Sequence, residues 1–230
     1  VLDDVSNKSA HYFQILQDEC DREIKLITNL LDLTRLDAGT EPLTLTTIEI
    51  TSWLAHLVEP FAVRAEVHQQ VFKTDIPQAL PTLTTDLGYL ERLLSELLNN
   101  ACKYSPANAT ITLAASYFDT NDDWINPAIA QPISSDSDNT NATITNPGSP
   151  VPTPKLFICV TNTGVEIAEK ERDRIFQKFY RIPNNDPWKY DGTGLGLALA
   201  KRLADRLNAE LSVSSSNNQT TFSLHLPLTL

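Results

Sequence analysis

The sequence contains no methionine and no uninterrupted apolar run long enough for a membrane-spanning helix. Such a helix needs about 18 to 20 mostly apolar residues, so we expect no membrane contact within this chain. No basic segment followed by an apolar one stands at the start, which argues against a secretion signal. Because the chain begins at Val1 without an initiator, we expect a longer protein, with any sensory or membrane-anchored part upstream. The expected location of this chain is cytoplasmic.

Positive charge and cysteine are also scarce. The chain has 18 Lys and Arg against 29 Asp and Glu, which gives a net charge of −11 over 230 residues. Nucleic-acid surfaces need clustered basic side chains, so we expect no nucleic-acid partner. The three cysteines, Cys20, Cys102 and Cys159, lie far apart in apolar surroundings. This spacing argues against a disulfide framework or metal site and predicts buried thiols.

A long amphipathic helix is predicted for residues 9–38. It ends at Gly39, and Pro42 prevents it from resuming. A helix with so broad an apolar stripe needs a partner. Pairing with a second copy is the favoured interpretation, and packing on its own domain is the alternative. The stripe follows a nearly heptad spacing through Phe13, Leu16, Cys20, Ile24, Ile27, Leu31 and Thr34.

Residues 40–230 are predicted to form one domain after the helical segment 1–39. Periodicity indicates helices over 51–67, 86–104 and 195–207, with a charged helical turn at 168–179. The pairing of helices and strands predicts an α+β two-layer sandwich. Residues 119–154, rich in Ser, Asn, Asp, Thr and Pro, predict a disordered insertion, and polar residues 181–191 predict a mobile lid. Extended segments are expected at 43–50, 71–76, 82–84, 110–118, 155–161, 210–215 and 220–227.

Two segments point to a nucleotide site. The run ELLNNACKYS at residues 96–105 lies in a predicted helix whose apolar spacing leaves Glu96, Asn100 and Lys103 together on another face. The run GTGLGL at residues 192–197 opens a second helix. Bare backbone N–H groups and the positive end of a helix dipole can meet phosphate oxygens there.

With two further runs, these segments resemble the catalytic and ATP-binding domain of sensor histidine kinases, a branch of the GHKL ATPase superfamily. The four motifs are the N box at 96–105, the first glycine box NTGVEI at 162–167, the Phe box IFQKFYR at 175–181 and the second glycine box at 192–197. The run LLDLTRLDAG at 30–39 is similar to the end of the second dimerisation helix that precedes such domains. The resemblance implies the Bergerat fold, a mixed sheet backed by three helices. ATP would lie between the N-box helix and a flexible lid.

The resemblance also implies roles by position, with ATP and Mg²⁺ as cofactors. Asn100 would coordinate Mg²⁺, an ion that prefers oxygen ligands. Lys103 and Arg181 would face phosphate oxygens, and Tyr104 would lie near the nucleotide. Glu96 would act as general base or polarise the attacking nitrogen. The remaining nucleotide-binding residues implied are Asn162, Gly164, Gly192, Thr193, Gly194, Leu195 and Gly196.

Two residues depart from the family pattern. Asn162 replaces the usual Asp that accepts a hydrogen bond from the adenine amino group, and a neutral acceptor is weaker by about 1 kcal/mol. Glu166 replaces the second glycine of the first glycine box and adds bulk and charge near the entrance for the base. We expect these changes to weaken ATP binding without abolishing it.

None of the four histidines, His11, His56, His68 and His225, is followed by the acid and proline typical of a phosphoacceptor. The favoured function is therefore a kinase core that phosphorylates a histidine on a dimerisation helix outside this chain. The phosphoryl group would pass to the receiver domain of a response regulator, and the kinase would form a homodimer through residues 9–38. One alternative is a degenerate pseudokinase that acts as a dimerising signalling module. Another is a GHKL-type ATPase of the gyrase or chaperone kind, favoured by the spacing of Glu96 and Asn100.

Overall fold

The computed structural model of the chain describes residues 2–39, 41–118, 155–183 and 192–230. The predicted insertion at 119–154 and most of the predicted lid, residues 184–191, lie outside the described residues. The side chain of His11 also lies outside them. In the part that is described, no helix has the length and apolar character needed to cross a membrane.

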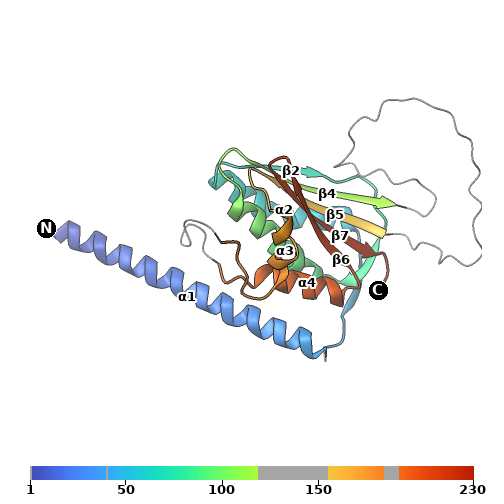
Figure 1. Cartoon of the computed structure of the whole chain (residues 1–230), viewed down its shortest axis with the longest axis horizontal. Helices are drawn as coiled ribbons and strands as arrows, with labels where there is room; N and C mark the ends of the chain where they lie inside the picture. The colour runs from blue at the N-terminus through green and yellow to red at the C-terminus, as the bar shows by residue number, and fades with distance from the viewer. Residues whose placement is uncertain (1, 40, 119–154, 184–191) are drawn as a thin grey trace, which may run out of the picture.

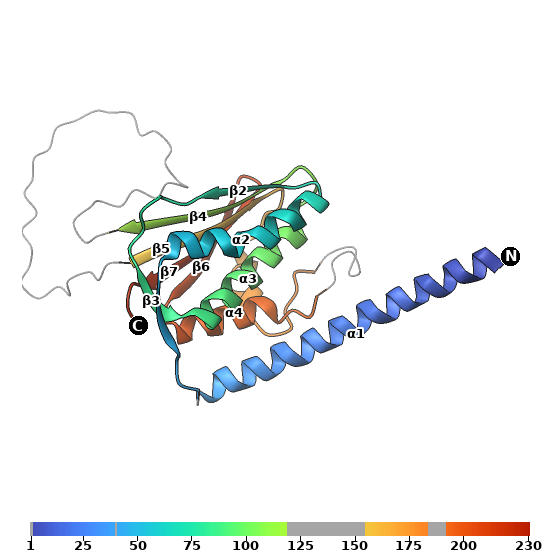
Figure 2. The ribbon, with the colours of Figure 1, turned by 180° about the vertical axis from the view of Figure 1, so that it is seen from behind.

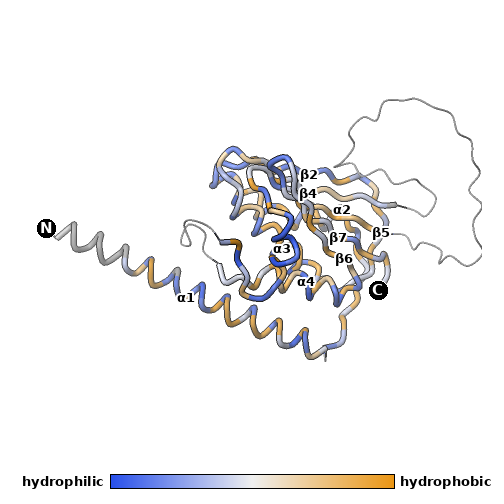
Figure 3. Tube along the Cα trace, viewed as in Figure 1, coloured by the Kyte–Doolittle hydropathy of each residue, from blue (hydrophilic) through white to orange (hydrophobic). Residues whose placement is uncertain are grey.

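Helix α1 (Leu2–Ala38) is a single long helix whose N-terminal half extends away from the other elements (Figure 1; Figure 2). Its C-terminal half packs on the domain through the buried Leu33 and the partly buried Leu26 and Leu36. The heptad stripe faces elsewhere, and Phe13 is 73% exposed. Hydrophobic and hydrophilic residues alternate along the coloured part of this helix (Figure 3). One face of α1 packs on its own domain, as the alternative interpretation predicts, and the heptad face is exposed.

The exposed heptad face corrects one prediction about the cysteines. Cys20 lies on this face and is exposed, so the prediction of burial is wrong for it. The prediction holds for Cys102, which is buried, and in part for Cys159, which is half-buried. Burial raises the pKa of both of these thiols, and they remain neutral packing groups.

The domain has the predicted α+β architecture, with a five-stranded mixed sheet in the order β2-β4-β5-β7-β6. β2 and β4 run parallel and the other pairs are antiparallel. Three helices cover one face of the sheet: α2 (Ile50–Val67), α3 (Leu87–Tyr104) and α4 (Gly196–Arg206) (Figure 1; Figure 2). The sheet strands are β2 (Val71–Asp75), β4 (Thr110–Phe118), β5 (Lys155–Thr163), β6 (Glu210–Ser216) and β7 (Gln219–Pro227).

The first predicted strand forms, but it lies outside this sheet. β1 (Leu45–Ile48) pairs antiparallel with β3 (Leu83–Asp86) in a separate two-stranded ribbon. Asp86 joins the ribbon to α3, because its carboxylate accepts hydrogen bonds from the backbone N–H of Tyr89 at 3.1 Å and of Thr44 at 2.8 Å. The first of these bonds caps α3 and fixes where the N-box helix begins.

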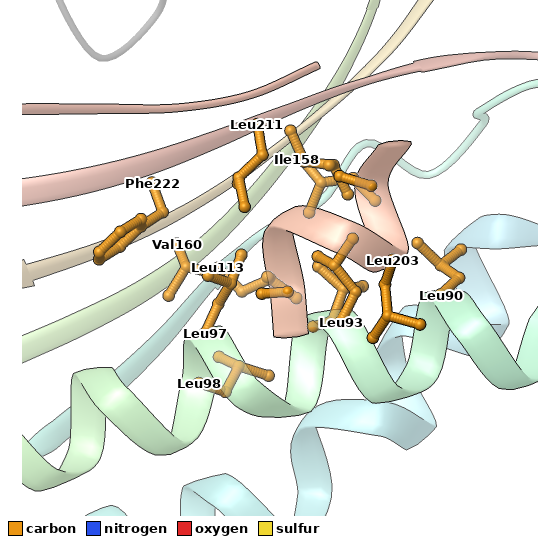
Figure 4. Close-up of a cluster of buried hydrophobic side chains, with 14 of the residues drawn as sticks. Leu90, Leu93, Leu97, Leu98, Leu113, Ile158, Val160, Leu203, Leu211 and Phe222 are labelled. Carbon is orange, nitrogen blue, oxygen red and sulfur yellow. The ribbon is translucent and has the colours of Figure 1, made fainter. Parts of the chain in front are cut away.

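The core lies between α3, α4 and the sheet (Figure 4). Leu90, Leu93 and Leu97 of α3 are fully buried, as the helical spacing predicts. Each buried leucine contributes about 1.5 to 3 kcal/mol to the free energy of folding. On β5 the buried residues alternate strictly, and this alternation continues to Asn162 at the far end of the strand. The core therefore fixes α3 and β5 so that one face of α3 and the end of β5 border the same cavity.

The charged segment 168–179 forms two short 3-10 turns, η1 (Glu169–Glu171) and η2 (Arg174–Phe176). The guanidinium of Arg172 donates hydrogen bonds to the carbonyls of Ile167 and Ser215, which holds the segment against β6. This segment leads into the remaining part of the Phe box.

Candidate functional site

A cavity of about 870 Å³ lies between α1, α3, the end of β5, the Phe box and the start of α4. All four sequence motifs contribute to its walls. Of the residues expected at the nucleotide site, Leu195 alone does not line the cavity, because its side chain is fully buried in the core at the start of α4. The expected residues that line the cavity are Glu96, Asn100, Lys103, Tyr104, Asn162, Gly164, Arg181, Gly192, Thr193, Gly194 and Gly196.

Glu96 on α3 is 4% exposed, so it is not an ordinary surface carboxylate of a helix. One carboxylate oxygen, Oε1, lies 3.4 Å from a guanidinium nitrogen of Arg92, one turn earlier on the same helix. The other oxygen, Oε2, reaches Gly196, where an added Cβ would lie only 2.5 Å away. Burial of a charge requires such a partner. Glycine at position 196 leaves room for this carboxylate at the cavity wall.

Lys103 and Asn100 follow Glu96 along the same face of α3. The ammonium of Lys103 reaches Gly192, where a Cβ would overlap its Nζ atom, and lies 5.0 Å from the centre of the Tyr104 ring. The side-chain nitrogen of Asn100, Nδ2, is buried and has no hydrogen-bond partner among the described residues. Because the second glycine box has no side chains at its glycines, polar side chains of the N-box helix can lie directly against its backbone.

The Phe box and the second glycine box are held together at Gly194. Phe179 donates its backbone N–H to the carbonyl of Gly194 at 3.0 Å. Both residues have positive φ, +63° for Phe179 and +71° for Gly194. A Cβ at position 194 would lie 2.8 Å from the carbonyl carbon of Phe179. Only glycine fits this contact without movement of the neighbouring backbone.

Tyr180, which was not singled out in the sequence, also lines the cavity. Its hydroxyl donates a hydrogen bond to Glu171, and this bond to a carboxylate raises the pKa of the phenol. The guanidinium of Arg174 lies 4.4 Å from the centre of the Tyr180 ring, and it also pairs with Glu171 at 3.5 Å. These contacts anchor the segment that carries Arg181 to the cavity wall.

The first glycine box forms the floor beside β7. Gly164 has φ +88°, and a Cβ there would lie 2.6 Å from the ring of Pro106. Glu166 lines the cavity as expected, but its carboxylate accepts a hydrogen bond at 3.3 Å from the backbone N–H of Asn218. The turn between β6 and β7 therefore holds the charge of Glu166. Asn162 is buried at the floor, where it can accept a hydrogen bond from a bound ligand.

Helix α1 supplies one wall of the cavity through Arg22, Lys25 and Asn29, which the sequence analysis did not identify. The contact is fixed farther along the helix by Asp37. Its carboxylate lies 2.7 Å from the ammonium of Lys178 in the Phe box and 3.1 Å from Arg202 of α4. The bond to Lys178 lowers the pKa of Asp37 below its usual value. Sequence periodicity favoured a dimer for α1 and gave packing on its own domain as the alternative, but it did not identify the residues that make this contact.

The residues at the cavity fit a nucleotide with Mg²⁺. Among the described residues, no group of three or more His, Cys, Asp or Glu side chains forms a ready metal site. Mg²⁺ commonly takes one or two protein oxygens together with substrate phosphates. The side-chain oxygen of Asn100, which lines the cavity, would supply one such ligand. Its buried nitrogen Nδ2, which has no hydrogen-bond partner among the described residues, would donate to an oxygen of the nucleotide.

Comparison with known proteins agrees with this geometry. The model of the family described as "Histidine kinase-, DNA gyrase B-, and HSP90-like ATPase" matches residues 85–230, more than half of the chain. The chain is 24% identical over 220 residues to the sensor histidine kinase WalK of Bacillus subtilis, and the match covers 95% of this chain and 31% of WalK. It is 27% identical over 221 residues to the sensor protein VanS of Enterococcus faecium, with 96% and 48% covered. The chain thus spans a third to a half of these two relatives.

Solved structures share the fold. Full-length ShkA in complex with AMPPNP superposes with a TM-score of 0.71 at 23% identity, and the match covers 95% of this chain and 38% of ShkA. The histidine kinase AdeS of Acinetobacter baumannii superposes with a TM-score of 0.66 at 16% identity, with 95% and 84% covered. In both cases the match extends beyond the domain that follows residue 40 and includes part of helix α1.

Proposed function

Since the chain belongs to the family of histidine kinase-, DNA gyrase B- and HSP90-like ATPases, we propose that it is the ATP-binding catalytic core of a sensor protein-histidine kinase. The observation that carries this proposal is the cavity lined by Glu96, Asn100 and Lys103 of one helix, of which Glu96 and Lys103 reach the second glycine box. Named sensor kinases among its relatives support the same function.

In the proposed reaction, the γ-phosphoryl group of ATP passes to a ring nitrogen of a histidine, so that an N–P bond forms and the bond to ADP breaks. Asn162 accepts a hydrogen bond from the adenine amino group, and Lys103 and Arg181 offset the charge of the phosphates. Asn100 holds Mg²⁺, which neutralises phosphate charge when bound. Glu96 takes up the proton of the attacking nitrogen or polarises it. Catalysis then depends mainly on the positioning of the reacting groups and on neutralisation of the phosphate charge.

The acceptor histidine is proposed to come from a dimerisation helix outside this chain. Of the three histidines whose side chains are described, none lines the cavity. His56 bonds to the carbonyl of Ser52 at 2.8 Å, and His68 ends α2. His225 packs against Phe157 on the sheet, and burial lowers its pKa. These contacts suit structural roles.

The proposed organisation is a dimerisation helix over residues 1–39 followed by a catalytic domain over 40–230. The exposed heptad face of α1 supports a homodimer through residues 9–38. The proposed downstream partner is the receiver domain of a response regulator, and the proposed location of the chain is cytoplasmic. No nucleic-acid partner is proposed, given the net charge of −11.

The second candidate function is ATP hydrolysis without a protein acceptor. The burial of Glu96 at the cavity wall, four residues before Asn100, favours it, because a carboxylate there can activate water as well as a histidine. Release of phosphate from ATP in the absence of any acceptor helix would support this candidate. Phosphoryl transfer only to a supplied helix that bears the histidine would exclude it.

The proposed site is tested by calorimetric titration of the chain with AMPPNP, with and without Mg²⁺. We expect saturable binding that Mg²⁺ strengthens in the wild type and that Asn100→Asp removes, because a carboxylate at this position repels the phosphates. Asn208→Asp makes the same chemical change at an exposed position beyond the end of α4, outside the cavity wall, and should bind like the wild type. If the wild type does not bind nucleotide at millimolar concentration, the pseudokinase alternative replaces the kinase.

A separate prediction concerns the neutral acceptor in the first glycine box. We expect Asn162→Asp to raise the affinity for AMPPNP about fivefold, because a charged acceptor strengthens the bond to the adenine amino group by about 1 kcal/mol. The same titration with inosine triphosphate, which lacks that amino group, provides the control and should show no gain. A gain of equal size for both nucleotides would contradict the assignment of Asn162 to the adenine.

A further inference from the structure

Three polar side chains of α1 face the cavity together. Arg22, Lys25 and Asn29 are spaced by three and four residues, which places them on one face of the helix, and all three line the cavity. This face differs from the exposed heptad stripe that includes Ile24 and Leu31. The same helix therefore carries an apolar surface for a partner and a basic surface turned to the site.

Asn29 lines the cavity and is linked to Glu96 through Arg92. It is 1% exposed, and its carbonyl oxygen Oδ1 accepts a hydrogen bond from Nη2 of Arg92 at 2.5 Å. The same nitrogen of Arg92 lies 3.4 Å from Glu96. A single guanidinium nitrogen thus joins Asn29 to the carboxylate proposed to act in the reaction.

The amide nitrogen of Asn29 is a donor without an acceptor. Nδ2 is buried and has no hydrogen-bond partner among the described residues. A buried donor left unsatisfied is destabilising, and an oxygen atom of a ligand would satisfy it. This is the same signature that marks Asn100 across the cavity. Two unsatisfied amides in the walls of one cavity point to a ligand with several acceptor oxygens.

The charges around the cavity favour an anion, although the chain as a whole carries −11. Lys25 is exposed at the wall, and Arg22, which also pairs with Glu19 at 3.5 Å, is half-buried. Of the two acids that line the cavity, Glu96 is paired with Arg92 and Glu166 is held by a backbone N–H. Among the described residues, four cationic side chains line the cavity against these two acids, so the wall carries a net positive charge: Arg22, Lys25, Lys103 and Arg181.

We propose that Arg22, Lys25 and Asn29 form a phosphate subsite through which α1 binds the terminal phosphate of a nucleoside triphosphate. The proposal rests on the proposed function. Asn29 donates its free N–H to a non-bridging phosphate oxygen, and the two cations offset the charge of the phosphate. A diphosphate does not reach this subsite. Triphosphate binding and the packing of α1 on the domain are consequently coupled, each strengthening the other.

The subsite is tested by titrating the double variant Arg22→Gln with Lys25→Gln against Mg²⁺ with AMPPNP and against Mg²⁺ with ADP. We expect the affinity for AMPPNP to fall about tenfold or more and that for ADP to change less than twofold, because only the third phosphate meets the lost cations. Lys73→Gln with Lys170→Gln removes the same two charges from exposed positions outside the cavity and should leave both affinities unchanged.

A second variant separates binding from the packing of α1. Asn29→Asp keeps an acceptor for Arg92 at the same size but loses the free N–H and adds a charge that repels phosphate. It should retain the melting temperature of the wild type and lose the preference for AMPPNP over ADP. Equal losses for the two nucleotides, or unchanged affinities in both variants, overturn the subsite. Failure of the wild type to bind any nucleotide contradicts the proposed function instead.

Discussion

Glu96→Gln is expected to reduce phosphoryl transfer by about 100- to 10,000-fold, the usual contribution of a positioned general base. The amide oxygen can still face Arg92, which lies 3.4 Å from the carboxylate, and the side chain keeps its size beside Gly196. The fold and the affinity for AMPPNP should therefore change little. Transfer of label from ATP to a supplied helix that bears the acceptor histidine measures the rate.

Glu169→Gln is the matched control for this variant, because it makes the same change at an exposed acid outside the cavity wall. It should transfer phosphate at the wild-type rate. If Glu96→Gln keeps more than a tenth of that rate, the carboxylate serves only to pair with Arg92. In that case Glu96 is a structural residue, and the histidine finds its base elsewhere.

Gly194→Ala is expected to lower the affinity for Mg²⁺ with AMPPNP by at least about tenfold. The added Cβ would lie 2.8 Å from the carbonyl carbon and 3.0 Å from Cα of Phe179. These are backbone atoms, so the Phe box and the second glycine box must move apart. Positive φ adds a cost of about 1 to 2 kcal/mol for a residue with a Cβ. Because the main core lies between α3, α4 and the sheet, thermal unfolding should be cooperative as in the wild type.

Gly39→Ala separates backbone strain from the steric contact. Gly39 has φ +63°, close to that of Gly194, but nothing lies within 4 Å of a Cβ added there. Calorimetric titration of both variants distinguishes the two causes. Nucleotide affinity should be normal in Gly39→Ala and reduced in Gly194→Ala, and equal affinities would refute the importance of the contact with Phe179.

The two variants test different properties of one site. Glu96 belongs to α3, whose position the core fixes, whereas Gly194 belongs to a contact between two irregular segments. Loss of rate without loss of binding in the first variant, and loss of binding in the second, is the pattern expected of a kinase. A pseudokinase that binds nucleotide only as a structural ligand would respond to the second change alone.

The sequence alone determined the elements with strong local patterns. The strand over residues 110–118 forms as predicted, and α3 begins one residue after the predicted helix start because Asp86 is its cap. Both depend on periodicity and capping, which act over a few residues. The order of the four motifs likewise indicated the family before any contact was known.

Only the tertiary structure decided how these elements meet. Helical periodicity placed Glu96 on the polar face of α3, one turn after Arg92, but only the tertiary structure brings Gly196 against its carboxylate. The pairing of β1 with β3, the exposure of Cys20 and the placement of Arg22, Lys25 and Asn29 at the cavity depend on contacts between distant segments. A local pattern specifies which side of a helix is apolar, whereas the packing of the whole chain selects what each side meets.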